Sequence, residues 1–343
     1  MFLSWNESFR TMMKYIVTLV LLFFSVEVFS QRIDSKQIWY NNNHSAFTSL
    51  VKYKGNYYCA FREAGAHISK GADLGKIRII SSKNGKKWSS VALLSKEYVD
   101  LRDPWLSITP KGLLMVSMGG SSAKLNFRAQ VSFSKDGKFF SVPQPVQFDY
   151  DGANVHGWPW HLTWHKGMGY TVMYRSGVIV LLKTKDGIHY DFITQLQAPG
   201  FLDESVIQFL SDDRMVILTR REFEHKSSLL WISNPPYDNW TYNDTGVYIG
   251  GPELMELDDE HLLIGGRRVD EKGQYTCIWT SDLNGNFKEI LSLHNPVFDC
   301  SYPSFLIRGR KIWCTYYASY GKHEDAAIYL TKIPVKLIKS SYK

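Results

Sequence analysis

The amino-acid sequence predicts an all-β chain folded as a six-bladed β-propeller, and two observations support this. A turn with a hydroxyl residue, an Asp/Asn-Gly pair and a closing aromatic recurs every 48 to 52 residues. The segments between these turns are short and rich in Val, Ile, Tyr, Phe and Trp, as β-strands require. The three clearest copies, which we call the repeat turns, are Ser82–Trp88, Ser134–Phe140 and Thr184–Tyr190, with weaker copies at Ser233–Trp240 and Ser281–Phe287.

Each repeat turn has the chemistry of a β-hairpin. The glycine supplies the positive φ of the turn, the Ser or Thr side chain bonds the turn backbone, and the aromatic packs beneath it. We therefore expect the turns to stabilise hairpins on the rim of the ring, away from any functional site.

The strand segments set the number of blades. Gly112 to Met118 and Met215 to Thr219 are typical of the expected strands. The stretch from Trp39 to Ile333 accommodates six repeats of about 50 residues, the last ending in Ala326 to Ile333 without a repeat turn. We expect a strand near Gln37 to Tyr40 to complete the last sheet and close the ring.

The N-terminal segment is typical of a secretory signal peptide covering residues 1–30. Lys14 belongs to a positive region, Tyr15 to Phe24 is apolar, and Val28-Phe29-Ser30 precedes a plausible cleavage site. The apolar run is short for a membrane span, and no cysteine stands at the cleavage site to carry a lipid anchor. We expect an exported protein, periplasmic or secreted, with residues 31–343 forming a single domain.

Composition narrows the choice of partner. The 343 residues carry a formal net charge of +7, with Lys and Arg scattered along the chain, and export argues against nucleic acid. An anionic glycan is the expected partner; no cofactor or metal is expected, and the oligomeric state is left open.

The four cysteines show no CxxC or zinc spacing, and we expect buried free thiols.

The repeat turns resemble the Asp box of the sialidase-like (BNR-repeat) six-bladed propellers. Asp203-Glu204-Ser205-Val206, with Arg220-Arg221 one hairpin later, resembles the sialidase stretch in which a glutamate precedes an arginine. Asp299 to Ser304, followed by Lys311 to Tyr317, resembles the last-blade segment that holds the sialidase tyrosine. The Phe-Arg-Glu, Leu-Arg-Asp-Pro and Thr-Trp-His elements are similar to those of a divergent exported subgroup often labelled exo-alpha-sialidase.

One family element is missing. Sialidases hold the substrate carboxylate with three arginines, because a forked guanidinium matches a carboxylate. His44 to Leu50 occupies the place of their opening Arg-Ile-Pro strand, with Ala46 at the arginine position. Arg220 (or Arg221) and Arg267 (or Arg268) fit the second and third arginines, and Arg62 or Arg102 is the candidate to replace the first.

Polar residues recur at corresponding points of the repeats. Propeller sites gather where the inner strands of all blades converge, so residues about 50 positions apart can meet. The candidates, one group from each repeat, are Arg62, Glu63 and His67; Arg102 and Asp103; His161 and His165; Glu204 and Arg220; Glu253 and Arg267; Asp299 and Tyr302.

The resemblance implies catalytic roles for some of these residues. Tyr302 is the expected nucleophile, with Glu204 as the carboxylate that draws its proton. The general acid is expected in the loop Ala64 to Gly75, as either His67 or Asp73. A phenol suits an anomeric carbon that bears a carboxylate, which would repel an anionic nucleophile.

The remaining candidates are expected to bind substrate. They are Arg62, Arg102, Asp103, Arg220, Arg267, His44, His161, His165 and Glu253. Strand alternation predicts that His161 and His165 share a face, although roughly 13 Å apart and so unable to share a metal.

Three functions compete. The first is a retaining, sialidase-like glycoside hydrolase that removes a terminal anionic sugar. The second is a polysaccharide lyase that neutralises a uronate carboxylate and removes the C5 proton with Tyr or His, or another glycosidase that acts on uronate-containing glycans. The third is a glycan-binding propeller without turnover.

Overall fold

A computed structural model describes residues 33–69, 73–121, 129–149, 157–320 and 325–342. These residues belong to one compact unit, Asp34–Lys343, apart from Ile33. The predicted signal peptide, residues 1–30, lies outside the described residues and stays a prediction. In the described ranges, no helix has the length and apolar character needed to cross a membrane.

The described chain is almost entirely β-structure, in five hydrogen-bonded sheets. Three sheets have four strands each. The first consists of β6 (Asp100–Ile108), β7 (Leu114–Ser121), β8 (Gln130–Ser134) and β9 (Gln144–Pro145), and the second of β15 (Phe201–Phe209), β16 (Met215–Glu222), β17 (Leu229–Ser233) and β18 (Thr241–Asp244). The third consists of β19 (Gly250–Glu256), β20 (His261–Asp270), β21 (Gly273–Asp282) and β22 (Phe287–Ser292).

A fourth sheet has five strands: β11 (Trp158–His165), β12 (Met168–Arg175), β13 (Val178–Thr184), β14 (His189–Leu196) and, pairing parallel to β14, β10 (Gln147–Asp149). The largest sheet has eight strands: β23 (Cys300–Arg308), β24 (Lys311–Ser319), β25 (Ala326–Pro334), β2 (His44–Tyr53), β3 (Asn56–Ala64), β4 (Lys76–Ser82) and β5 (Ser89–Leu94), with β1 (Ser35–Trp39) paired to β25. The helix α2 (Val335–Lys339) follows β25.

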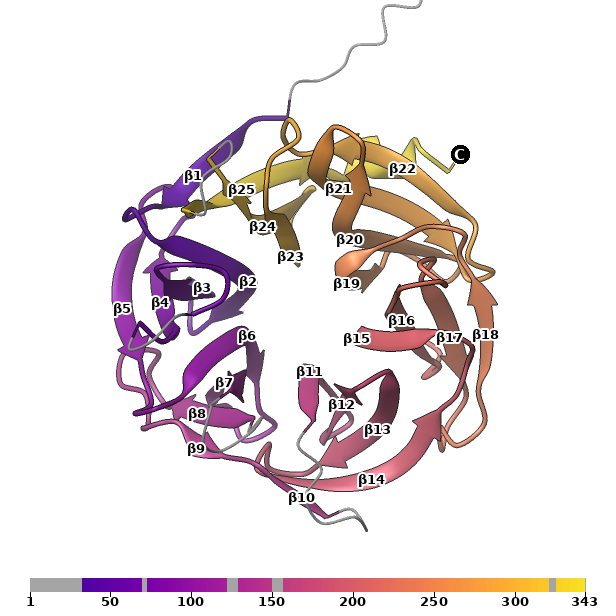
Figure 1. Ribbon diagram of the computed structural model, residues 1–343, viewed down its shortest axis with the longest axis horizontal. Helices are drawn as coiled ribbons and strands as arrows, with labels where there is room; N and C mark the ends of the chain where they lie inside the picture. Colours follow the sequence, from indigo (N-terminus) through magenta and orange to yellow (C-terminus); the bar gives the residue numbers. More distant parts are fainter. Residues whose placement is uncertain (1–32, 70–72, 122–128, 150–156, 321–324, 343) are drawn as a thin grey trace, which may run out of the picture. The chain divides into compact units, whose positions relative to one another are not determined.

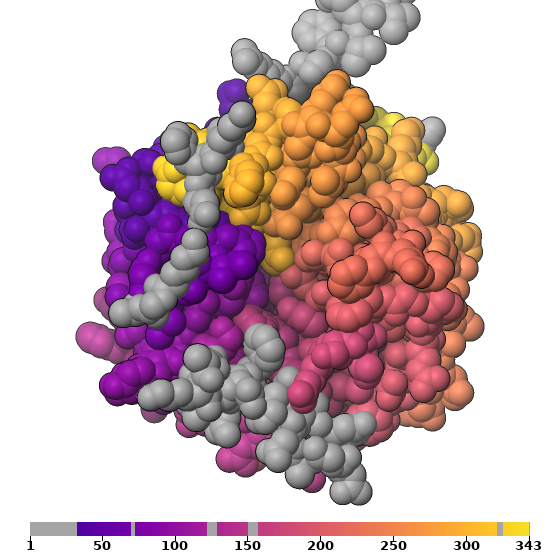
Figure 2. Space-filling model, viewed as in Figure 1, coloured from indigo at the N-terminus to yellow at the C-terminus, as the bar shows by residue number. Residues whose placement is uncertain are grey.

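The sheets stand around a common axis, with the strands β2, β6, β11, β15, β19 and β23 innermost (Figure 1). Each of these inner strands contacts the next in this order, and β23 contacts β2, so the ring is closed. On the face shown in Figure 2, colours follow one another around the ring in chain order, until the C-terminal segments meet the N-terminal ones. The described chain is therefore an all-β propeller, as predicted.

The sheet count differs from the expected six separate sheets. A single parallel pair, His44 with Ala326, joins β2 to β25, so two groups of strands count as one eight-stranded sheet. The predicted ring closure is confirmed, because β1 pairs antiparallel with β25 from Ser35 opposite Thr331 to Trp39 opposite Ile328.

The repeat turns have the expected hairpin chemistry. The glycines have φ of 71°, 73° and 77° at Gly85, Gly137 and Gly187. In each turn, the glycine N–H donates a hydrogen bond of 2.8–2.9 Å to the hydroxyl oxygen of the Ser or Thr three residues earlier. The Asp186 carboxylate accepts two further backbone N–H groups of its turn. The turn carboxylates thus have structural partners.

The inner strands share a β-bulge near their starts. The extra residue of a bulge re-aims a side chain and bends the strand, which makes bulges common beside functional sites. The register shifts between Ala46 and Ser49, Arg102 and Trp105, Trp160 and Thr163, Leu202 and Ser205, Gly250 and Glu253, and Ser301 and Ser304. Five residues inside these bulges have positive φ: Phe47, Asp103, His161, Gly251 and Tyr302.

Side chains that follow the bulges bond the free edge of the neighbouring inner strand. Ser49 Oγ accepts Leu106 N–H at 2.9 Å, and Ser304 Oγ accepts Leu50 N–H at 3.0 Å. Because an unpaired buried backbone group is costly, these bonds stabilise the closed ring. The four cysteines are buried free thiols, as expected.

Candidate active site

The centre of the site is a tyrosine–glutamate pair from two inner strands. The Tyr302 hydroxyl on β23 donates a 2.5 Å hydrogen bond to Oε1 of Glu204 on β15, and both side chains are buried. The Gly251 N–H donates to Oε2 of Glu204 at 2.9 Å. Gly251 also leaves room for the phenol ring, because a Cβ there would lie 2.6 Å from Tyr302 Cδ2.

The protonation states of the pair follow from their surroundings. Burial acts to raise the pKa of Glu204, but the Arg220 charge and the Tyr302 hydrogen bond outweigh it and lower the pKa. Burial and the Glu204 charge raise the pKa of Tyr302 well above its ordinary value, although Arg220 and Arg267 oppose this. At neutral pH a protonated phenol therefore faces a carboxylate, so the phenol becomes nucleophilic only as Glu204 takes its proton.

Arg220 is held between two glutamates. Its Nη1 donates to Glu204 Oε2 at 2.9 Å, and its Nε donates to Glu222. The Tyr248 hydroxyl donates to the same Glu222 oxygen at 3.1 Å. The Arg220 side chain keeps 17% exposure, so it remains accessible to a ligand while held in position.

Arg267 lies over the Tyr302 ring, with its guanidinium carbon 5.4 Å from the ring centroid. Its Nη2 donates to Asp299 Oδ1 at 3.0 Å and to the Cys300 carbonyl at 2.7 Å. The Tyr317 hydroxyl donates to the same Asp299 oxygen at 2.8 Å. Arg267 thus lies in the site, and its hydrogen bonds to Asp299 and Cys300 fix its position.

Two histidines share the other oxygen of Asp299. Asp299 Oδ2 accepts from His44 Nε2 at 3.0 Å and from His67 Nδ1 at 2.8 Å. Burial acts to raise the pKa of Asp299, but these bonds and the Arg267 charge lower it, so Asp299 is a carboxylate. His44 is buried, whereas the His67 side chain is 36% exposed. The carboxylate therefore orients His67 and leaves its Nε2 for proton transfer.

The same three residues are the one group among the described residues whose ligand atoms are close enough to hold a metal ion. The three atoms lie within 4.8 Å of one another. However, Arg267 Nη2 lies 3.0 Å from the other oxygen of Asp299, and its positive charge opposes a second cation. The cluster therefore fits two imidazoles hydrogen-bonded to a carboxylate better than a divalent metal.

Phe47 connects the histidines to the tyrosine and was not predicted. Its ring centroid lies 4.7 Å from that of Tyr302 and 5.4 Å from that of His67. The Arg102 guanidinium carbon lies 5.2 Å above the Phe47 ring. Among the described residues, Arg102 forms one ion pair, with Asp100 at 3.9 Å, so the hydrogen-bond donors of Arg102 remain largely available. Arg102 is therefore suited to the missing arginine's task.

Asp103, at the bulge of β6, belongs to this charge cluster. Burial raises its pKa to about 7, although the charge of Arg102 acts to lower it. Glu204 contributes to the rise, which places the two carboxylates in one electrostatic field. Two unpredicted residues share that field: burial raises the pKa of Asp203 to about 6, and burial and Glu204 raise the pKa of Tyr174.

Arg62 does not occupy the position expected of a substrate-binding residue. It is fully buried, and its Nε and Nη2 donate to the Asp100 carboxylate at 3.0–3.2 Å. Its Nη1 donates to the Ala66 carbonyl and its Nη2 to Ser69 Oγ. Its donors are used in fixing the loop that carries His67, so we correct the predicted role to a structural one.

His161 and Glu253 lie together next to Trp160, whose ring centroid is 5.6 Å from that of Tyr302. His161 stacks between Trp105 and Trp160, whose ring centroids lie 3.7 and 4.6 Å from its own. Burial lowers the pKa of His161 and raises that of Glu253. Glu253 Oε1 accepts the Phe305 N–H at 3.3 Å, while its Oε2 lies 3.7 Å from His161 Nδ1. This pair supports the floor of the site.

Two further candidates have their hydrogen-bond partners outside the cluster. The bulge after Trp160 breaks the alternation that predicted a common face for His161 and His165. His165 instead stacks on Phe209 and bonds Asp213 at 3.0 Å, so its predicted place in the site is wrong. Asp73 is exposed, and its Oδ2 accepts the Gly65 N–H at 2.7 Å, which closes the loop.

The three site residues that the sequence did not single out differ in the sequence signal that they carry. Asp203 stands beside Glu204 in the stretch that resembles sialidases, so its position was a usable signal. Phe47 and Tyr174 carry no such signal, because an aromatic residue in an apolar strand is most simply a core residue.

Solved structures share this architecture, although no family model and no curated protein matches the sequence. A protein of unknown function from Dyadobacter fermentans aligns with a TM-score of 0.75 and 17% identity, over 88% of this chain and 98% of that chain. An alpha-L-arabinanase from Penicillium chrysogenum, complexed with arabinobiose, gives 0.64 and 14%, over 88% and 98%. A Trypanosoma rangeli sialidase in complex with the inhibitor DANA gives 0.66 and 9%, over 87% and 56%.

The TM-scores of 0.64 to 0.75 establish a shared fold. The chain is an all-β propeller of the sialidase-like kind, which sialidases and arabinanases both use. The predicted resemblance is therefore confirmed at the level of the fold. The chain spans just over half the length of the trypanosomal sialidase.

Proposed function

We propose that this protein is a retaining glycoside hydrolase that removes a terminal anionic sugar, sialic acid or a similar carboxylated sugar, from glycans. The observation that carries the proposal is the 2.5 Å hydrogen bond from Tyr302 to Glu204. A carboxylate that accepts the proton of a buried phenol is the arrangement that a tyrosine nucleophile needs. The protein is then an exported enzyme, acting in the periplasm or outside the cell, and needing no cofactor.

In the first step, Tyr302 Oη attacks the anomeric carbon and its proton passes to Glu204. The bond to the leaving oxygen breaks, and His67 Nε2 gives that oxygen a proton. In the second step, His67 takes a proton from water, whose oxygen attacks the anomeric carbon. The bond to Tyr302 breaks, and Glu204 returns the proton to the phenolate.

Three arginines favour an anionic sugar. Arg220 and Arg267 flank Tyr302, and Arg102 lies above Phe47 on the side where the first sialidase arginine is absent. Forked guanidinium groups match a carboxylate, and a neutral phenol is not repelled by it. Asp103 is the acceptor for sugar hydroxyls.

Six blades are part of this proposal. The eight-stranded sheet divides at the His44–Ala326 pair into β2 to β5 and β23 to β25 with β1. With the other four sheets, that division makes six groups, each headed by one bulged inner strand.

A lyase is the second candidate, and two observations favour it. Asp299 orients His67 beside the arginines, as a base that removes a proton next to a carboxylate would require. The buried Ala46 at the first arginine position also departs from a sialidase. A lyase would leave an unsaturated sugar, whereas a hydrolase would not.

The test is turnover of an aryl α-sialoside by the purified protein and by Tyr302→Phe. Release that is lost in the variant supports the hydrolase. If the folded protein releases no aryl group, uronate-capped glycans are tested next. Ultraviolet absorbance then reports whether an unsaturated sugar is formed. Glycan binding without turnover on either substrate class would favour a non-catalytic propeller and contradict the proposal.

A further inference from the structure

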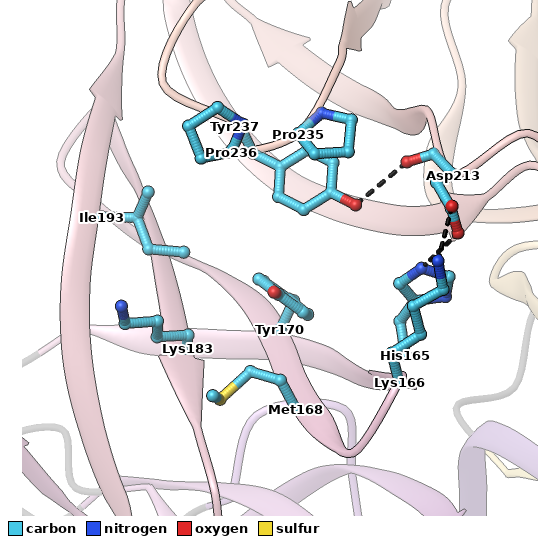
Figure 3. A pocket seen from close by; sticks show the side chains of 10 residues that line it. All are labelled: His165, Lys166, Met168, Tyr170, Lys183, Ile193, Asp213, Pro235, Pro236 and Tyr237. Carbon is cyan, nitrogen blue, oxygen red and sulfur yellow. Dashed lines mark hydrogen bonds and ion pairs between the residues drawn. The ribbon is translucent and has the colours of Figure 1, made fainter.

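A second cavity lies away from the candidate active site, between the sheet of β11 to β14 and that of β15 to β18. It encloses about 480 Å³, within the range of small-molecule sites. His165 lines it, four residues along β11 from His161, a step of roughly 13 Å. The other lining residues come from β12, β13, β14 and three turns, as Figure 3 shows.

The walls of this cavity are apolar and fixed. Tyr170, Ile193, Pro236 and Tyr237 line it, with Met168 on another side (Figure 3). The Tyr237 hydroxyl donates to the Asp213 carbonyl at 2.9 Å, which holds its ring in place. Rigid aromatic and prolyl faces suit the C–H face of a sugar ring, because little freedom is lost on binding.

The polar groups stand at two ends of the cavity. At one end, the Asp213 carboxylate bonds His165 at 3.0 Å and Lys166 at 2.5 Å, so its charge is already balanced. At the other end, Lys183 forms no ion pair or hydrogen bond with any described residue; Figure 3 shows it across the cavity from Asp213. Asp191 lies opposite Lys183 in the register of β13 and β14, so the Lys183 charge is partly balanced. Lys183 is nevertheless the lining cation without an ion pair or hydrogen bond to a described residue, and it is the group that would pair with an anion.

We propose that this cavity is a second, non-catalytic glycan site that binds a carboxylated sugar. The ring lies against Tyr170 and Tyr237, its carboxylate pairs with Lys183, and its hydroxyls bond Asp213 and His165. Such a site holds an anionic glycan on the protein independently of the Tyr302 site. The proposal does not rest on turnover, because binding alone tests it.

The test is calorimetric titration of the purified protein with digalacturonate at low salt, and with its neutral dimethyl ester. Digalacturonate should bind and the ester should bind at least tenfold more weakly. Lys183→Met keeps the side-chain stem and removes the charge, so it should weaken digalacturonate at least tenfold. Lys185→Met is the matched control on the exposed neighbouring turn and should leave affinity within about twofold.

A second variant guards against misfolding. Ile193→Trp fills the cavity without changing charge, and it should abolish the same binding, with thermal unfolding showing that both variants are folded. Binding that Arg267→Met removes is assigned to the candidate active site, whereas the binding that Lys183→Met removes should persist in Arg267→Met. The proposal is overturned if no binding occurs, if the ester binds equally well, or if affinity falls in Arg267→Met but not in Lys183→Met.

Discussion

The Tyr302 hydroxyl donates a 2.5 Å hydrogen bond to Glu204, 98 positions earlier in the chain. The two residues meet because bulges aim them from separate inner strands toward the ring axis. The bond makes them one chemical unit, since the phenol attacks only as the carboxylate accepts its proton.

A unit of this kind predicts non-additive losses. Tyr302→Phe and Glu204→Gln should each lower kcat/KM by about 10³-fold or more, and the double variant should lose little further. Single and double variants are compared on one activated substrate. If the fold-losses in kcat/KM of the two single variants multiply in the double variant, the two residues act separately.

Gly251 predicts a substitution that damages activity through Tyr302. A Cβ at Gly251 would lie 2.6 Å from Tyr302 Cδ2, and φ is 56°. Gly246 is the matched control, because its φ is 66° and a Cβ there would contact nothing within 4 Å. Alanine should cost about 1 kcal/mol or more of stability at both positions through strain.

Only Gly251→Ala should reduce kcat strongly, because it alone displaces the phenol. Urea unfolding measures the strain and initial rates measure the displacement. Equal activity losses in both glycine variants would mean that strain, rather than the Tyr302 contact, is responsible.

The repeat turns could be predicted because their information is local. A hydroxyl, an Asp/Asn-Gly pair and an aromatic within seven residues specify a hairpin wherever they occur. Ring closure through an N-terminal strand was expected from propellers in general, and β1 provides it. The sheet count was less accessible, since it depends on the single pair His44–Ala326.

The site was only partly predictable, because bulges and burial are tertiary properties. Alternation placed His161 with His165, and one extra residue in β11 separated them. Arg62 has the residue type and position of a substrate ligand, yet Asp100 from a neighbouring strand uses its donors. Tyr302 and Glu204 were found through resemblance to sialidases rather than through spacing.

His67 and Asp73 can be separated by leaving-group dependence. If His67 is the acid, His67→Ala should lower kcat/KM on a sugar-linked substrate by 10²-fold or more. The loss should be much smaller on a nitrophenyl glycoside, whose leaving group needs no proton. Asp73→Ala should show no such contrast, because Asp73 closes its loop onto Gly65. The reverse pattern would assign the acid to Asp73.

Arg62 should matter for stability more than for binding. Arg62→Met leaves Asp100 buried without its main partner, which should cost about 3–5 kcal/mol. Arg214→Met removes an exposed pair with Asp212 and should cost about 1 kcal/mol or less. Urea unfolding measures both. An unchanged unfolding midpoint with a raised KM would restore the substrate-binding role.

Asp103 should destabilise the folded protein at neutral and higher pH. Burial raises its folded-state pKa to about 7, above the value of roughly 3.9 in an unfolded chain. Below about pH 4 both states are protonated, and the carboxyl has no effect on the free energy of unfolding. Between pH 4 and 7 only the unfolded state ionises, so stability falls as pH rises, and above pH 7 the penalty is constant.

Asp103→Asn removes this titration. Its gain in Tm over the parent should therefore grow from pH 4 to about pH 7 and then level off, while activity falls because a sugar-hydroxyl acceptor is lost. Thermal unfolding in a series of buffers measures the gain. A pH-independent change in Tm would show that Asp103 has an ordinary pKa in the folded state, and would remove it from the charge cluster around Glu204.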